Sequence, residues 1–192
     1  MGAIIKATMD SKTKISNAAI DLFTKKGIKG TTTKELARSA GIAEGTIYKH
    51  FKSKNDLALK LFLNYMDLFR IRLIESASNY SNPQDKLKAL IKAFFDFARE
   101  EAKAYHYIMV GHHTELSRVP RARLKPKDIF VELIREGVEK GEFRKIDENI
   151  GAALITGMIT RAILFLDIGV IKKDYNQVVS EVIEASLRVL KA

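Results

Sequence analysis

The amino-acid sequence predicts an all-α protein of about nine helices. Apolar residues recur at spacings of three and four along most of the chain, and the alternation typical of a half-buried strand does not stand out. Residues that cap helices precede most of these apolar stripes. The chain has 192 residues, of which 46% are hydrophobic, so it can bury the core of one domain or of a small domain joined to a larger one.

The first predicted helix starts at Asp10 and Ser11 and ends at Gly27. Asp and Ser are common at helix N-termini, and glycine is favoured after the last turn because it accepts a left-handed backbone. One face of this helix is apolar, which predicts that the helix packs on a core. That face consists of Ile15, Ala18, Ala19, Leu22 and Phe23.

Residues 31–51 predict two short helices joined by a tight turn at Gly41. Thr32 and Glu35 form a capping box, in which each side chain hydrogen-bonds the backbone N–H of the other residue. The second helix begins near Glu44. Two short helices in this arrangement are typical of a helix-turn-helix, whose second helix enters the DNA major groove.

The rest of the sequence predicts further helices separated by polar turns. Ser53 and Asp56 cap a long helix, and Pro83 suits the first position of the next. Residues 105–116 are weakly helical, and residues 118–128, with five Lys or Arg and two prolines, are expected to form a surface loop. The last three helices are expected at about 129–140, at 147–167 and from Asp174 onward.

The net charge of +10 is concentrated near the N-terminus. Residues 1–55 carry 11 Lys and Arg against 4 Asp and Glu, whereas the remainder carries 22 against 19. A basic segment beside a nearly neutral one is typical of phosphate binding, with a merely soluble basic surface as the alternative.

Three observations argue against a disulfide-bonded, a secreted or lipidated, and a membrane-spanning protein. The chain has no cysteine, which excludes disulfides and thiolate metal sites. Its start shows neither a secretory signal nor a myristoylation pattern, so a cytoplasmic protein is expected. Residues 150–171 are long and apolar, but Arg161 and Asp167 interrupt them, which favours a helix at a protein interface over a membrane span.

Residues 15–61 contain a set of residues at characteristic spacings, namely Ala18-Ala19, Leu22-Phe23, Gly27, Thr31-Thr32, Leu36-Ala37, Ala40-Gly41-Ile42, Gly45-Thr46-Ile47-Tyr48, His50-Phe51, Ser53-Lys54 and Leu57. With these residues, the segment resembles the DNA-binding domain of the TetR family of transcriptional regulators. The resemblance implies a helix-turn-helix domain over residues 1–52, with the motif at about 32–51, and an effector-binding and dimerisation domain over 53–192. It also implies a homodimer that reads a palindromic operator in double-stranded DNA and is released by a small-molecule effector, most often as a repressor.

The resemblance and the helical spacing together indicate which residues meet DNA. Gly45 would let the backbone approach the duplex closely. Tyr48 either reaches the DNA backbone or packs partly in the core. Glu44 either caps its helix or accepts a hydrogen bond from a cytosine amino group. The full set is Thr33, Lys34, Glu44, Gly45, Thr46, Tyr48, Lys49, His50 and Lys54.

The C-terminal part is rich in aromatic residues and Met, which suits an apolar effector cavity as well as an ordinary core. Arg161 is either a polar anchor for the effector or a salt-bridge partner at the dimer interface. The expected effector is largely apolar, and fatty acyl-CoA is one class that similar regulators use. The cations of residues 118–127 would then meet its phosphates, or they are simply solvated. The candidate effector residues are Phe62, Met66, Phe69, Tyr107, Met158, Arg161 and Phe165.

Dimerisation is expected to use the last two long helices. Two such helices from each of two chains form a four-helix bundle with two-fold symmetry. The candidate interface residues are Ile150, Leu154, Gly157, Val178, Val182 and Leu190.

Other chemistry has less support in the sequence. His106, His112, His113 and Glu115 are close together, but the adjacent histidines point about 100° apart on a helix and cannot share one face. A Gly-rich phosphate loop and a nucleophile elbow are both missing, so no enzyme, metal or cofactor is expected. The alternatives are a sequence-tolerant DNA-binding protein without an effector and an enzyme with an incidentally basic N-terminus.

Overall fold

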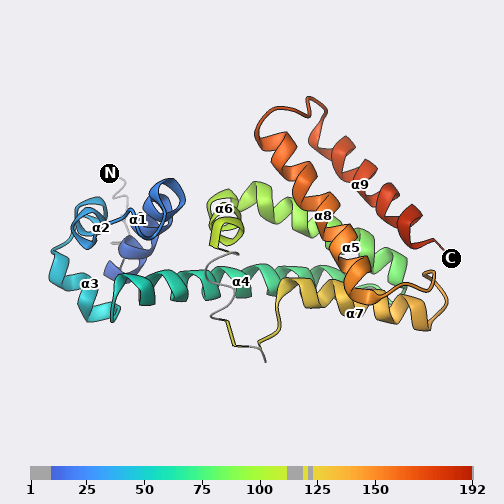
Figure 1. The fold of residues 1–192 in the computed structure, drawn as a ribbon, viewed down its shortest axis with the longest axis horizontal. Coiled ribbons are helices and arrows are strands. Elements are labelled where there is room, and N and C mark those ends of the chain that lie inside the picture. The colour runs from blue at the N-terminus through green and yellow to red at the C-terminus, as the bar shows by residue number, and fades with distance from the viewer. Residues whose placement is uncertain (1–9, 112–118, 121–122, 192) are drawn as a thin grey trace, which may run out of the picture. The chain divides into compact units, whose positions relative to one another are not determined.

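The computed structural model describes residues 10–111, 119–120 and 123–191, and these fold into nine α-helices (Figure 1). Apart from an isolated bridge between Phe143 and Lys191, these ranges contain no strand, and the all-α prediction is confirmed. The helices are α1 (Ser11–Lys26), α2 (Thr33–Ala40), α3 (Glu44–His50), α4 (Lys54–Ser78), α5 (Pro83–Glu100), α6 (Ala102–Gly111), α7 (Pro126–Glu139), α8 (Glu148–Asp167) and α9 (Tyr175–Leu190).

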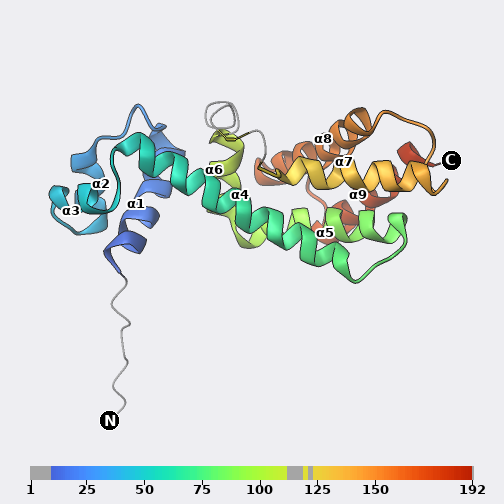
Figure 2. The ribbon, with the colours of Figure 1, turned by 90° about the horizontal axis from the view of Figure 1, so that it is seen from below.

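Contacts divide the chain into two compact units (Figures 1 and 2). The first unit comprises Met1–Tyr65 and Lys103–Val119, and the second comprises Met66–Ala102 and Pro120–Ala192. Helix α4 runs through both units, and nearly all of α6 belongs to the first. The first unit therefore extends beyond residue 52, where the sequence places the end of the DNA-binding domain.

In the first unit, α1, α2 and α3 pack on one another around a small apolar core. The predicted face of α1 is the buried one, with the difference that Ile20 is buried and Leu22 is partly exposed. Five core side chains are at most 1% exposed, namely Ile15, Ala19, Phe23, Leu36 and Ile47.

Helix α6 is tied to the first unit by one buried hydrogen bond and one surface ion pair. The hydroxyl of Tyr107 donates to the carbonyl of Ala58 in α4 at 2.8 Å, and its ring stacks on Phe23 of α1 with the centroids 6.3 Å apart. At the surface, Lys103 pairs with Asp21 of α1 at 2.7 Å. These contacts place α6 against α1 and the first part of α4.

In the second unit, α5 contacts α7, α8 and α9, and α7 packs along α8. The close approach of α7 and α8 depends on Gly151, because a Cβ there would lie 2.9 Å from Cδ1 of Ile134. The aromatic residues of α4 and α5 fill the neighbouring core, where Phe69 stacks on Phe97 with ring centroids 4.6 Å apart.

Most predicted helix starts are confirmed. Asp147 and Asp174 each accept hydrogen bonds from two backbone N–H groups at the starts of α8 and α9. The predicted start of α7 near Ile129 is wrong, because the helix begins earlier, at Pro126. A proline suits the first helical position, where no backbone donor is needed, and Asp128 accepts from the backbone N–H of Lys125 at 2.8 Å.

Candidate nucleic-acid interface

The turn between α2 and α3 is fixed by local contacts. Thr32 and Glu35 form the predicted capping box, with the backbone N–H of Thr32 donating to Glu35 at 2.9 Å. Gly41 adopts the left-handed conformation, with φ 64° and ψ 41°, which glycine accepts without strain. The surface ion pair of Lys26 and Glu35, 2.7 Å long, links α1 to α2. These contacts determine the direction in which α3 leaves the turn.

Helix α3 has one buried residue and a broad exposed face. Ile47 is fully buried and anchors the helix, whereas Tyr48 is 54% exposed and Lys49 and His50 are also exposed. A Cβ added to Gly45 would meet no atom within 4 Å, so this part of α3 is open to an approaching partner. The exposed face therefore offers a phenol, an ammonium and an imidazole, all groups that bind phosphates or base edges.

Three of the predicted DNA-contact residues have partners within the protein. The hydroxyl of Thr33 donates to Oε1 of Glu44 at 2.5 Å and thereby joins the first residue of α2 to the first residue of α3. The ammonium of Lys54 donates to the carbonyl oxygen of the buried Thr31. An ammonium has three donors, so Lys54 can still contact a phosphate while it holds the loop before α2.

The predicted effector residues belong to both compact units. Phe62 and Tyr107 are buried in the first unit, and Met66 and Phe69 are buried in the second. Met158, Arg161 and Phe165 line an open groove of about 910 Å³ between α8 and α9. The guanidinium of Arg161 lies 5.9 Å from the centre of the Phe165 ring, and no acid of the described residues forms an ion pair with it.

The same groove contains predicted dimer residues. Gly157, Val178 and Val182 line it, and Ile150 and Leu154 continue the exposed apolar face of α8, with 57% and 46% exposure. Two predicted functions therefore fall on one surface.

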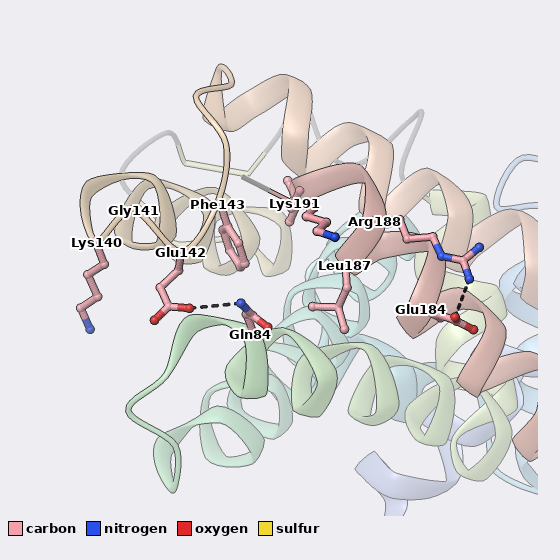
Figure 3. Close-up of a pocket in the computed structure, with 10 residues that line it drawn as sticks. Gln84, Lys140, Gly141, Glu142, Phe143, Glu184, Leu187, Arg188 and Lys191 are labelled. Carbon is pink, nitrogen blue, oxygen red and sulfur yellow. Dashed lines mark hydrogen bonds and ion pairs between the residues drawn. The ribbon is translucent and has the colours of Figure 1, made fainter.

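Leu190 differs from the other predicted interface residues. It is fully buried inside the chain, so it offers no surface to a partner. The end of α9 borders a hollow of about 640 Å³, where polar side chains are hydrogen-bonded to each other (Figure 3). There Gln84 donates to Glu142 at 3.1 Å and Arg188 to Glu184 at 2.5 Å.

Cations just before α7 and in its first turn form ion pairs within the chain. Arg123 pairs with Asp67, and Lys127 pairs with Asp128 at 2.7 Å. Arg118 and Arg121 lie outside the described residues, and so do the metal candidates His112, His113 and Glu115. Among the residues that are described, no three His, Asp or Glu side chains come together as metal ligands.

By length and composition alone, one helix of the described chain could cross a membrane. This is α8, with a mean hydropathy of 1.6. A helix at a protein interface has the same composition, so this property is a weak indication.

The three-helix unit, the glycine turn and the exposed cationic face of α3 define a helix-turn-helix protein. Residues 15–61 match the family described as bacterial regulatory proteins of the tetR family, and residues 80–164 match a tetracyclin repressor-like C-terminal domain. The two matches together span more than half of the chain, and the chain belongs to the TetR family. Regulators of this family are DNA-binding transcription factors and not enzymes.

Three similar proteins illustrate the relationship. The transcriptional repressor KstR2 of Mycolicibacterium smegmatis is 30% identical over 132 residues, which cover 66% of this chain and 64% of KstR2, so the chain spans slightly less than two thirds of that relative. The fatty acid metabolism regulator protein of Bacillus subtilis is 26% identical over 160 residues, or 78% of this chain and 80% of that protein. A crystal structure of the B. subtilis regulator FadR in complex with stearoyl-CoA shares the fold, with a TM-score of 0.72 and 23% identity over 93% of this chain and 98% of that chain.

Proposed function

We propose that this protein is a transcriptional repressor that binds a palindromic operator as a homodimer and is released by a small, largely apolar effector. The observation that carries DNA binding is the exposed face of α3, where Tyr48, Lys49 and His50 project from a helix anchored by Ile47. A cytoplasmic location belongs to the same proposal. We retain residues 1–52 as the DNA-binding domain and 53–192 as the effector-binding and dimerisation domain.

The roles on the DNA side follow from the chemistry of each group. Lys34, Lys49, His50 and Lys54 contact phosphates, which supply most of the affinity. Thr46 and Tyr48 donate hydroxyl hydrogen bonds to phosphates or base edges. Thr33 acts through Glu44, and Gly45 leaves space for the duplex.

The experiment that tests DNA binding is selection of bound fragments from the genome of the source organism, followed by a titration of the selected duplex against a random duplex of equal length. A sequence-specific regulator binds its operator about 10³-fold or more tightly than random DNA. Equal binding of both duplexes would support the sequence-tolerant alternative instead.

The same titration at several salt concentrations tests the interface. The Lys49→Ala variant should bind all duplexes more weakly, with a salt dependence shallower by about one ion, because one phosphate contact is lost. Lys88→Ala is the matched control, since Lys88 lies on α5 and pairs with Asp85 at 2.8 Å. Equal slopes for both variants would remove Lys49 from the interface.

The proposed effector class is a long-chain fatty acyl thioester. The fold shared with FadR, whose crystal structure contains stearoyl-CoA, supports this class, as do the many aromatic and Met side chains of the C-terminal part. Stearoyl-CoA, stearate and free coenzyme A should be compared for release of the selected duplex. Release by stearoyl-CoA alone supports the proposal, and release by none of the three contradicts this choice of effector while leaving DNA binding intact.

The groove between α8 and α9 belongs, in this proposal, to the dimer interface. It is open to solvent in the single chain, and the apolar residues beside it are exposed along α8. A second copy placed on it by a two-fold axis would cover both groove and stripe. We therefore assign Met158, Arg161 and Phe165 to the interface together with Ile150, Leu154, Gly157, Val178 and Val182, and we leave Leu190 out.

A further inference from the structure

Glu44 differs from the neighbouring acids because its side chain forms no ion pair with a cation of the described residues. Glu35 of α2 pairs with Lys26 at 2.7 Å, and Asp56 at the start of α4 pairs with Lys60 at 2.8 Å. Glu44 is bonded instead to a neutral group, the hydroxyl of Thr33, and has no cation partner among the described residues. Its carboxylate therefore carries an uncompensated negative charge on the face proposed to meet DNA.

The hydrogen bond from Thr33 also fixes where this charge points. Thr33 holds Oε1 of Glu44, and Oε2 has no hydrogen-bond partner in the described part of the chain. Glu44 is exposed and stands four residues before Tyr48, so both lie on one face of α3. The position next to it, Gly45, has no side chain that could cover the carboxylate. A partner that reaches this face thus meets an immobilised acceptor.

An ionised carboxylate accepts hydrogen bonds and donates none. In the major groove, adenine presents the N6 amino group and cytosine the N4 amino group, whereas guanine and thymine present the carbonyl oxygens O6 and O4 at the equivalent edge. A carboxylate is attracted by an amino group and repelled by a carbonyl oxygen. It is also repelled by the phosphates of every duplex.

We infer that Glu44 is a specificity-determining residue, which accepts only adenine or cytosine at one position of each half-site and lowers affinity for all other DNA. This inference rests on the proposed DNA-binding function and adds to it the chemistry of one base position. Thr33 is a positioning residue, because it acts by orienting Glu44.

The test is selection from a duplex library with a randomised centre, performed with wild-type protein, Glu44→Gln and Thr33→Val. For the wild type, one position in each half-site should exclude guanine and thymine on one strand by about tenfold or more. Glu44→Gln can donate as well as accept, so the exclusion at this position should fall to about twofold or less while all other positions keep their preference. The affinity of Glu44→Gln for random duplex should rise, with a salt dependence steeper by about one ion.

Asp10→Asn is the matched control, because it also removes one negative charge from the first unit, and Asp10 is exposed and makes no side-chain capping hydrogen bond. It should keep the wild-type preference at every position. Thr33→Val keeps the shape of the side chain but cannot donate, so it should weaken the preference at the same single position. Circular dichroism of each variant reports folding, and Thr33→Val provides the test if Glu44→Gln is unfolded.

The outcomes separate this inference from the function on which it rests. A motif that is identical for wild type and Glu44→Gln overturns the role of Glu44 and leaves DNA recognition standing. Relaxation by Asp10→Asn to the same extent also overturns it, because the loss of any acid from the first unit would then relax the preference. If the wild type enriches no motif, the proposed function and the inference both fail.

Discussion

At the scale of single residues, Glu35 holds two parts of the helix-turn-helix together. Its strongest partner is Lys26 of α1, and its carboxylate also accepts from the backbone and the hydroxyl of Thr32. These interactions lower the pKa of Glu35 from 4.5 to about 2. A carboxyl with a lower pKa in the folded state stabilises the fold above its unfolded pKa, and this stabilisation is lost as the pH falls toward the folded pKa.

The Glu35→Gln variant should therefore lose stability less steeply than the wild type between pH 4.5 and about 2. Glutamine preserves the cap but binds no proton, so the slope that belongs to Glu35 disappears. Urea unfolding at several pH values measures this slope. Glu139→Gln, which removes an exposed acid from α7, is the control for a general change in charge. Equal slopes for wild type and Glu35→Gln would contradict the assignment.

Tyr175 illustrates a polar atom that contributes little to stability. Its hydroxyl is buried and has no hydrogen-bond partner among the described residues. Burial, followed by the nearby charge of Asp96, raises the pKa of Tyr175 to about 12. The ring itself is well packed, with the guanidinium of Arg99 at 4.3 Å from its centre and an edge contact to Phe95.

The Tyr175→Phe variant should be as stable as the wild type or up to about 1 kcal/mol more stable, because it removes an unpaired buried hydroxyl and keeps the ring. The free energy of unfolding in urea measures the difference. Tyr175→Leu, which also removes the ring beneath Arg99, should be destabilised by comparison. A loss of more than about 1 kcal/mol in Tyr175→Phe would mean that the hydroxyl is hydrogen-bonded in solution.

At the scale of helices, local signals are sufficient for most helix bounds but not for the contacts between helices. The capping residues Thr32, Asp147 and Asp174 act on backbone groups two or three positions away, so the sequence predicts them directly. Tyr107 and Ala58 are 49 positions apart, and no spacing rule relates them. The sequence places the start of α7 too late, because two prolines within a basic stretch favour a loop, whereas Pro126 occupies the first position of the helix.

Helix α8 shows a second limit on what can be predicted from the sequence. It is apolar over most of its circumference, so periodicity did not separate a face for an effector from a face for a partner chain. Only the position of α9 shows that Met158, Arg161 and Phe165 lie in the same groove as Val178 and Val182. The sequence therefore assigns two different functions to residues that share one surface.

The close packing of α7 on the following turn gives a further prediction. A Cβ at Gly137 would lie 2.0 Å from Cδ2 of Phe143, whose ring is only 3% exposed. Alanine favours a helix by about 1 kcal/mol over glycine, but overpacking a core costs roughly 1–3 kcal/mol. Gly137→Ala should therefore lower the free energy of unfolding.

Gly45→Ala is the control for Gly137→Ala in this measurement, because a Cβ there meets nothing within 4 Å. It should be neutral or stabilising in urea unfolding, since only the helix preference of alanine acts at that position. If both variants gained stability equally, the Phe143 ring would have to move without cost, and the packing argument would be wrong.

At the scale of the whole molecule, α8 exposes more apolar surface than its fold requires. Ile150, Leu154 and Leu164 are between 41% and 57% exposed, and Ile168, directly after the helix, is 61% exposed. A contiguous apolar surface of this kind marks an interaction site. The adjoining groove of about 910 Å³ enlarges this surface, and two-fold pairing of α8 and α9 would bury it in a four-helix bundle.

The Leu154→Glu variant tests this arrangement, because a two-fold axis places both copies of the new carboxylate in the apolar interface. Burying an unpaired charge costs several kcal/mol. The dissociation constant of the dimer should therefore be at least about 100-fold higher than that of the wild type. Operator affinity should fall with it, since one subunit presents a single recognition helix to a palindrome whose two half-sites are read together. Sedimentation over a range of concentrations measures the first effect, and titration of the selected duplex measures the second.

Leu68→Glu is the matched control, because Leu68 is 40% exposed on α4 and does not line the groove. A dimer that persists in Leu154→Glu, or one that is lost equally in Leu68→Glu, would assign the contact between subunits to another surface.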